Sequence, residues 1–174
     1  MAWPSDPIVI ATVVAGTGTG AAIDLWTRRV PNPLTMGLAT IGVVFAACGI
    51  SGLTLGASLG GLAVGLLLML PGHVIGATGA GDVKLFAATG AFIGPTHMLA
   101  AFLYTALAGG VMAIVVSLWR RRLRQTVGDT ARLIATAGAN APAIESPLEN
   151  NRFAYAPAIA VGTIIAALWK VSML

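Results

Sequence analysis

Long apolar stretches alternate with short polar clusters along the chain. No Asp, Glu, Lys or Arg occurs in four of these stretches, at 7–23, 30–81, 85–119 and 153–169. A helix needs about 20 apolar residues to cross the hydrocarbon core of a bilayer, so the first and last stretches each accommodate one helix and the two longer stretches accommodate two each. The pattern predicts an all-α integral membrane protein, a polytopic bundle of about six transmembrane helices.

Breaker residues divide the two longer stretches, because Gly and Pro at 49–52 and 94–97 interrupt regular structure. The fourth helix is then shorter than a full crossing requires, and we expect it to be short or tilted against a neighbour. We expect a single membrane-embedded domain, 1–174, with helices at 8–26, 34–49, 53–71, 82–94, 98–118 and 154–171 and a polar loop at 119–153. We also expect the first helix to be retained rather than removed as a signal peptide.

Basic side chains predict the orientation of the bundle. If the first helix runs from outside to inside, every Lys and Arg except Lys170 falls on the inner side, as the positive-inside rule requires. Both termini then lie outside and the loop at 119–153 lies inside. The positive charges stand at the ends of apolar runs without interleaved aromatic residues, so topology and anionic lipid explain them better than nucleic acid does.

The composition of the chain limits the kinds of disulfide, metal and cofactor site that it can form. The chain is 57% hydrophobic and 9% charged, and Cys48 is its single cysteine, which excludes an intrachain disulfide and a cysteine-based zinc site. His73 and His97 fall at opposite ends of the predicted bundle, so we expect neither a metal site nor a cofactor. Three pairs of glycines four residues apart predict close helix packing within the molecule: Gly16 and Gly20, Gly56 and Gly60, and Gly61 and Gly65.

Two of the six acidic residues stand apart from the others. Asp24 lies in the last turn of the first predicted helix, and Asp82 lies at the head of the fourth, after a Gly-rich bend. By the predicted topology both lie at the same inner depth of the membrane. An ionisable group there costs a few kcal/mol and is a functional-site hypothesis that faces the bundle interior.

Two carboxyl groups held close together tend to share one proton and titrate as a pair. The ionised member then takes a proton from a water while the protonated member polarises a carbonyl, which hydrolyses an amide without a metal. The structural alternative makes Asp24 a partner of Arg28, four residues along the helix, and makes Asp82 a helix N-cap. Without further information the two explanations stand equal.

The surrounding motifs favour the catalytic explanation. Gly79-Ala80-Gly81-Asp82 forms a GxGD motif, and Asp24 is followed by Val30-Pro31-Asn32. Together, in this order, they resemble the type IV prepilin peptidase family. In that family an Asp at the inner end of the first helix, ahead of an Ile/Val-Pro-Asn turn, pairs with the Asp of GxGD at the start of the fourth. The resemblance covers essentially the whole chain and implies that Asp24 and Asp82 are catalytic.

Five further residues complete the predicted site. Gly79 and Gly81 are expected to allow φ values and a close backbone approach that other residues forbid, and to let an unwound substrate segment pair there as an added strand. Pro31 and Asn32 are expected to form the turn that begins the second helix. Lys84 is expected at the membrane interface, beside the substrate or as a snorkelling lysine.

The resemblance also implies a substrate and a location. Prepilin peptidases remove a short basic leader from pilin-like precursors at the inner face of the cytoplasmic membrane. Larger members carry an insertion with paired CxxC motifs and methylate the new N-terminus, whereas this chain runs from Arg29 directly into Val30-Pro31-Asn32. We therefore expect a member of the short subfamily that processes Flp-type, tight-adherence prepilins, without methyltransferase activity.

Other classes share single features of this chain. Archaeal preflagellin peptidases have the same pair of aspartates, whereas presenilin-like proteases pair GxGD with a Tyr-Asp motif and here Asp24 follows Ile23. The alternative from a different class is a small proton-coupled transporter subunit that uses Asp24 and Asp82 as a relay, although no inverted pair of broken helices is visible. A membrane scaffold, the third class, would tolerate Asn at both positions.

Overall fold

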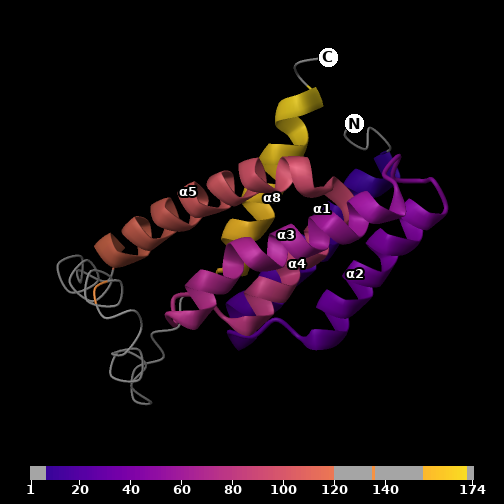
Figure 1. Ribbon diagram of the computed structural model, residues 1–174. Helices are drawn as coiled ribbons and strands as arrows, with labels where there is room; N and C mark the ends of the chain where they lie inside the picture. Colours follow the sequence, from indigo (N-terminus) through magenta and orange to yellow (C-terminus); the bar gives the residue numbers. More distant parts are fainter. Residues whose placement is uncertain (1–6, 120–134, 136–154, 172–174) are drawn as a thin grey trace.

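The computed structural model describes residues 7–119, 135 and 155–171. All regular structure in this part is helical, which confirms the predicted all-α fold class, whereas the number of membrane crossings stays a prediction (Figure 1). The helices are α1 Pro7–Thr27, α2 Asn32–Ala47, α3 Leu55–Val74, α4 Ala80–Ile93, α5 Pro95–Trp119 and α8 Ala156–Val171. Most of the predicted loop at 119–153 lies outside the described residues, and the single-domain assignment stays a prediction.

Three of the described helices are long and apolar enough to cross a membrane, namely α1, α3 and α5. Two shorter apolar helices are α2 and α8, and α4 has only 14 residues. Length and composition therefore indicate a membrane protein. The side on which each terminus lies stays a prediction.

The chain bends where its residues interrupt a helix. Pro31 is the N-cap of α2, and its carbonyl accepts the first helical hydrogen bonds, from Leu34 and Thr35. Between α2 and α3, Gly49 and Gly52 have φ values of 74° and 65°, a left-handed conformation that glycine adopts without a steric cost. These bends place α2 and α3 as a pair beside α4.

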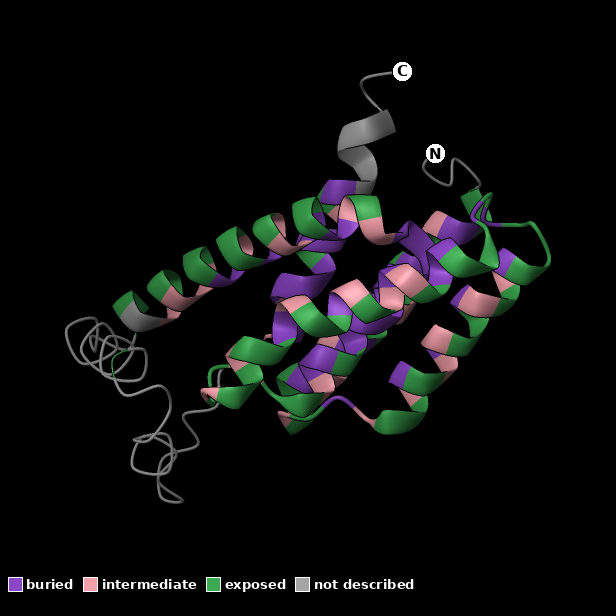
Figure 2. Ribbon diagram, viewed as in Figure 1, coloured by how far each residue is buried: buried purple, intermediate pink, exposed green. Residues whose placement is uncertain are grey.

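The short helix α4 is the centre of the bundle. Every residue from Leu85 to Ile93 is buried, and α4 contacts each of the other five helices described (Figure 2). Because neighbours surround it on all sides, it needs no lipid-facing stripe. The prediction of a short fourth helix is confirmed, and its enclosure holds the residues at its start in a fixed place.

Small residues allow α3 to cross α4 closely. A Cβ atom at Gly61 would overlap the carbonyl oxygen of Gly90, and one at Gly65 would lie 3.0 Å from the Cα of Ala87. The Ser58 hydroxyl donates to the Ala91 carbonyl across the same crossing, at 2.7 Å. The predicted close packing is therefore confirmed for Gly61 and Gly65.

The other predicted glycine pairs differ from each other. A Cβ at Gly16 would lie 2.5 Å from a methyl group of Leu38, and one at Gly20 would lie 3.0 Å from a methyl group of Leu85. Gly56 is an exception, because a Cβ there would meet no atom within 4 Å. The packing prediction is thus confirmed for Gly16 and Gly20 and is wrong for Gly56.

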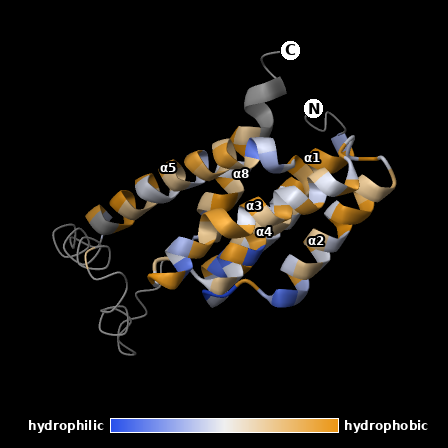
Figure 3. Cartoon of the chain, viewed as in Figure 1, coloured by the Kyte–Doolittle hydropathy of each residue, from blue (hydrophilic) through white to orange (hydrophobic). Residues whose placement is uncertain are grey.

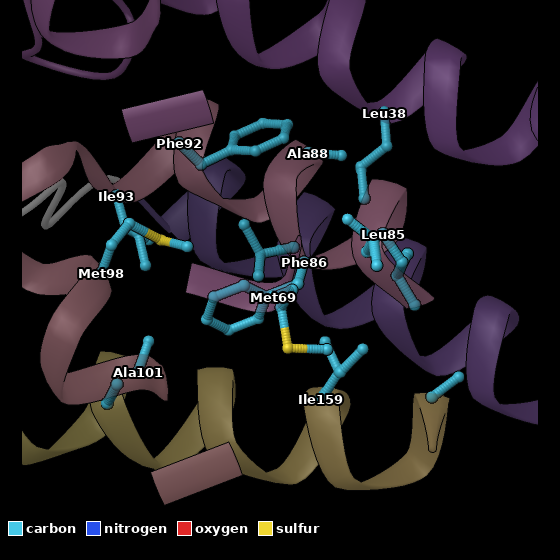
Figure 4. Packing of buried hydrophobic residues seen from close by; sticks show 14 of the residues in the cluster. Leu38, Met69, Leu85, Phe86, Ala88, Phe92, Ile93, Met98, Ala101 and Ile159 are labelled. Carbon is cyan, nitrogen blue, oxygen red and sulfur yellow. The ribbon is translucent and has the colours of Figure 1, made fainter. Parts of the chain in front are cut away.

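Side chains from α4 organise the hydrophobic core. Figure 4 shows Phe86 and Phe92 pointing in different directions from α4, with Met69 and Ile159 beside Phe86. Phe92 meets Phe45 of α2 edge to face at 6.0 Å between ring centroids. Helices in a bilayer associate through close packing, because lipid tails are as apolar as the core, so the dispersion contacts of these side chains fix α4 against the helices around it.

Polar and apolar surfaces separate along the bundle. The outer face of α5 is exposed and apolar, as a lipid-facing helix requires (Figure 3). Hydrophilic residues gather at one end of the bundle, where α1 ends and α2 and α4 begin. Both aspartates singled out in the sequence belong to these segments.

Candidate active site

Asp24 is held by a contact from the far end of the chain. It lies in the last turn of α1 and is only 4% exposed. The backbone N–H of Ala156, the first residue of α8, donates to its Oδ2 atom at 3.2 Å. The positive charge of Arg28 also acts on this carboxyl group. A buried carboxylate needs such compensation, because an unpaired charge away from water is very costly.

Asp82 is held by the start of its own helix. It is 6% exposed, and its Oδ2 atom accepts a hydrogen bond from the Gly79 N–H at 3.1 Å. Gly79, not Asp82, is the N-cap of α4, so the N-cap alternative is wrong in its detail: Asp82 is the third helical residue and reaches back to the cap. Its Oδ1 atom is buried and has no hydrogen-bond partner among the described residues.

The two carboxyl groups form a pair. Their side chains come from α1 and α4, and they lie close enough for their charges to act on each other. In each, a backbone N–H donates to Oδ2, and in Asp82 the second oxygen has no hydrogen-bond partner among the described residues. Two neighbouring buried carboxyl groups suit general acid–base chemistry on a water molecule.

The GxGD motif packs on the Val-Pro-Asn motif. A Cβ atom at Gly81 would lie 3.0 Å from both the Cβ and the carbonyl oxygen of Val30. A Cβ at Gly79 would lie 3.0 Å from Oδ2 of Asp82. The predicted close backbone approach is confirmed at Gly81, whereas the atom close to Gly79 belongs to the side chain of Asp82.

The predicted need for unusual φ values is wrong for these two glycines. Gly79 has φ −74° and ψ 149°, which any residue adopts, and Gly81 is helical. The left-handed residue of this bend is Gly76, with φ 79°. Space for the Asp82 carboxyl and for Val30, rather than backbone conformation, is what Gly79 and Gly81 provide.

Lys84 and Asn32 connect the same two segments at the surface. The Lys84 ammonium donates to Oδ1 of Asn32 at 2.9 Å, although these residues are 52 positions apart. The bond ties the start of α4 to the start of α2, where Pro31 is the N-cap as expected from the predicted turn. All seven predicted site residues thus belong to one contiguous region at the ends of α1, α2 and α4.

Neither histidine belongs to the pair formed by Asp24 and Asp82. Nδ1 of His73 lies 3.0 Å from the Thr78 carbonyl oxygen in the bend before Gly79, and Nδ1 of His97 lies 3.3 Å from the Ile93 carbonyl oxygen. The described residues contain no group of three His, Cys, Asp or Glu side chains able to hold a metal ion.

The sequence did not predict that residues at the start of α8 belong to the candidate site. Ala156 supplies the hydrogen bond to Asp24, and Tyr155, just before it, lies close enough to Asp82 for the two side chains to interact electrostatically. A backbone N–H leaves no mark in a sequence. The one available signal was Tyr155, an aromatic residue with a polar tip at the head of the last apolar run.

Comparison with known families agrees with the motifs. The model of the type IV leader peptidase family matches residues 11–114, which is more than half of the chain and includes both aspartates and both motifs. Searches of curated proteins and of solved structures gave no match. The resemblance seen in the sequence is confirmed, and the chain belongs to the type IV leader peptidase family.

Proposed function

We propose that this protein is an intramembrane aspartic endopeptidase whose catalytic groups are Asp24 and Asp82. One observation carries the proposal: two buried carboxyl groups, from helices far apart in the sequence, lie close enough to interact electrostatically in a membrane protein of a leader peptidase family. Ionisable residues buried in membrane helices are rare and costly, and they mark a functional site by default.

The proposed reaction is a direct attack by water. One carboxylate takes a proton from the water as general base, and the other carboxyl group donates its proton toward the scissile carbonyl. The amides of Gly79 and Ala156 orient the two carboxyls through their Oδ2 atoms. The segment that ends at Gly79, an exposed residue just before α4, is where an unwound substrate would add as a strand.

The proposed substrate is the leader segment of a pilin-like precursor of the Flp type. The proposed location of the site is the cytoplasmic face of the inner membrane, because Arg28, Arg29 and Lys84 follow the positive-inside rule. Cys48 is the single cysteine of the chain, which therefore has no paired CxxC motifs of the kind found in the larger, methylating members. This supports the proposal of peptidase activity without methylation. No observation favours the alternative of a proton relay in a transporter.

The test of this function is cleavage by purified protein in lipid vesicles. A Flp-type prepilin with its leader is incubated with the wild type and with the double variant Asp24→Asn/Asp82→Asn, and the products are identified by mass spectrometry. We expect a single cut ahead of the hydrophobic helix of the precursor by the wild type only. An intact precursor with the folded wild type, or equal cleavage by the double variant, would refute the proposal.

Gly81 offers a second test, independent of the carboxyl groups. Leu at this position would collide with Val30, which moves the GxGD segment away from the end of α1. We expect Gly81→Leu to abolish cleavage while expression and membrane insertion persist. The matched control is Gly18→Leu, because Gly18 lies on α1 with no atom within 4 Å of its Cβ position. Retained cleavage by Gly81→Leu, measured on a gel, would contradict the role assigned to this contact.

A further inference from the structure

We infer that the start of α8 is a positioning element of the active site, in which the Ala156 amide orients Asp24 and the Tyr155 ring, seated on Gly109, holds that amide in place. The inference rests on the proposed peptidase function, because it assigns this element an effect on the catalytic step. It concerns a helix beyond residues 11–114, the part matched by the family model.

The contact between Ala156 and Asp24 joins the two ends of the described chain. It links residues 132 positions apart, and Ala156 is fully buried. Ala156 is the first residue of α8, where backbone N–H groups have no partner within the helix and carry a partial positive charge. A fixed donor on Oδ2 sets the rotation of the carboxyl group and therefore the direction of its second oxygen.

Tyr155 provides the support for this donor. Its ring lies against α5 at Gly109, where a Cβ atom would be 2.6 Å from Cε2 and 3.1 Å from the hydroxyl oxygen. Only glycine leaves this space free. The Tyr155 carbonyl accepts hydrogen bonds from Ala158 and Ile159, so the position of the residue sets the first turn of α8.

The same helix pair is fixed further along. A Cβ atom at Gly162 would overlap the backbone of Thr105, so α5 and α8 are in direct contact there. With the Tyr155 ring at Gly109, α8 is anchored to α5 on both sides of its first turns. Since Tyr155 also lies within electrostatic reach of Asp82, the start of α8 faces both members of the carboxyl pair.

Two neighbouring glycines give a matched test of this element. Ala at Gly109 displaces the Tyr155 ring, whereas Ala at Gly110 meets no atom within 4 Å. A misplacement of about 1 Å costs up to about 100-fold in rate, so we expect Gly109→Ala to lower kcat by up to that factor with little change in KM. Gly110→Ala should keep the wild-type kcat and KM.

Substitution of Tyr155 separates positioning from a general effect on folding. Tyr155→Ala should lower kcat as Gly109→Ala does, with KM unchanged, whereas Tyr155→Phe keeps the ring and should restore part of the lost kcat. A wild-type kcat in Tyr155→Ala, or equal effects of Gly109→Ala and Gly110→Ala, would overturn the inference.

The hydrogen bond itself is tested without any cleavage. In an NMR spectrum of the protein in detergent, the amide proton of Ala156 should move upfield in Asp24→Ala, while that of Ala158, which bonds the Tyr155 carbonyl at 3.0 Å, should not move. An unchanged Ala156 signal refutes the positioning element even if the wild type cleaves precursor. Absence of cleavage together with the expected shift refutes the peptidase function and leaves the contact established.

Discussion

Asn at either Asp24 or Asp82 is expected to lower kcat for precursor cleavage by about 10²–10⁴-fold, the usual contribution of one general acid or base. Asn has nearly the shape of Asp, and its carbonyl oxygen still accepts from Ala156 or Gly79, so each variant should fold. What it loses is the ability to give and take a proton. The measurement is the initial rate of product formation at saturating precursor, with thermal unfolding as a check of the fold.

The double variant sharpens this prediction. Because the two carboxyls act on one water as a unit, removing both should cost little more than removing one. Asp24→Glu and Asp82→Glu are the matched controls that keep the carboxyl but move it, and each should retain more activity than the corresponding Asn variant. Wild-type rates in either single Asn variant, or losses that multiply in the double variant, would contradict the paired mechanism.

The helices were predictable because charge and breaker residues mark their ends. The second helix was expected at 34–49 and is found at Asn32–Ala47, a shift caused by Pro31, which caps the helix earlier than the hydropathy suggested. The fifth was expected from 98 and begins at Pro95, because Gly94 alone, with φ 73°, makes the turn after α4. Proline is well tolerated in the first turn of a helix, so it marks a beginning there rather than a gap.

The centre of the bundle was not predictable in the same way. Hydropathy separates apolar from polar segments, but lipid-facing and protein-facing residues in a membrane are equally apolar. The burial of every residue from Leu85 to Ile93 therefore left no pattern beyond the short length of α4. The glycines carried part of this information: Gly61 and Gly65 lie on the crossing with α4, whereas Gly56, at a similar spacing, faces open space.

Only part of the candidate site could be predicted from the sequence. Asp24 and Asp82 stood out because an acidic residue at the end of an apolar run needs an explanation, and the structure brings their side chains within electrostatic reach. Of the two reasons for which Gly79 and Gly81 were singled out, the unusual φ values were wrong, whereas close contact is present at both positions. The contact from Ala156 could not be predicted from the sequence, because its contribution is a backbone N–H.

Ala at Gly61 is expected to destabilise the bundle by about 1–3 kcal/mol, the usual cost of overpacking a well-packed core. The added Cβ would overlap the Gly90 carbonyl oxygen, and this atom belongs to helix backbone, which cannot rotate away as a side chain would. The matched control on the same helix is Gly56→Ala, where the Cβ meets nothing within 4 Å. Thermal unfolding in detergent should show a lowered midpoint for Gly61→Ala alone. Because α4 carries Asp82 at its start, the same displacement should also reduce cleavage, and equal unfolding midpoints for the two variants would contradict the close crossing of α3 and α4.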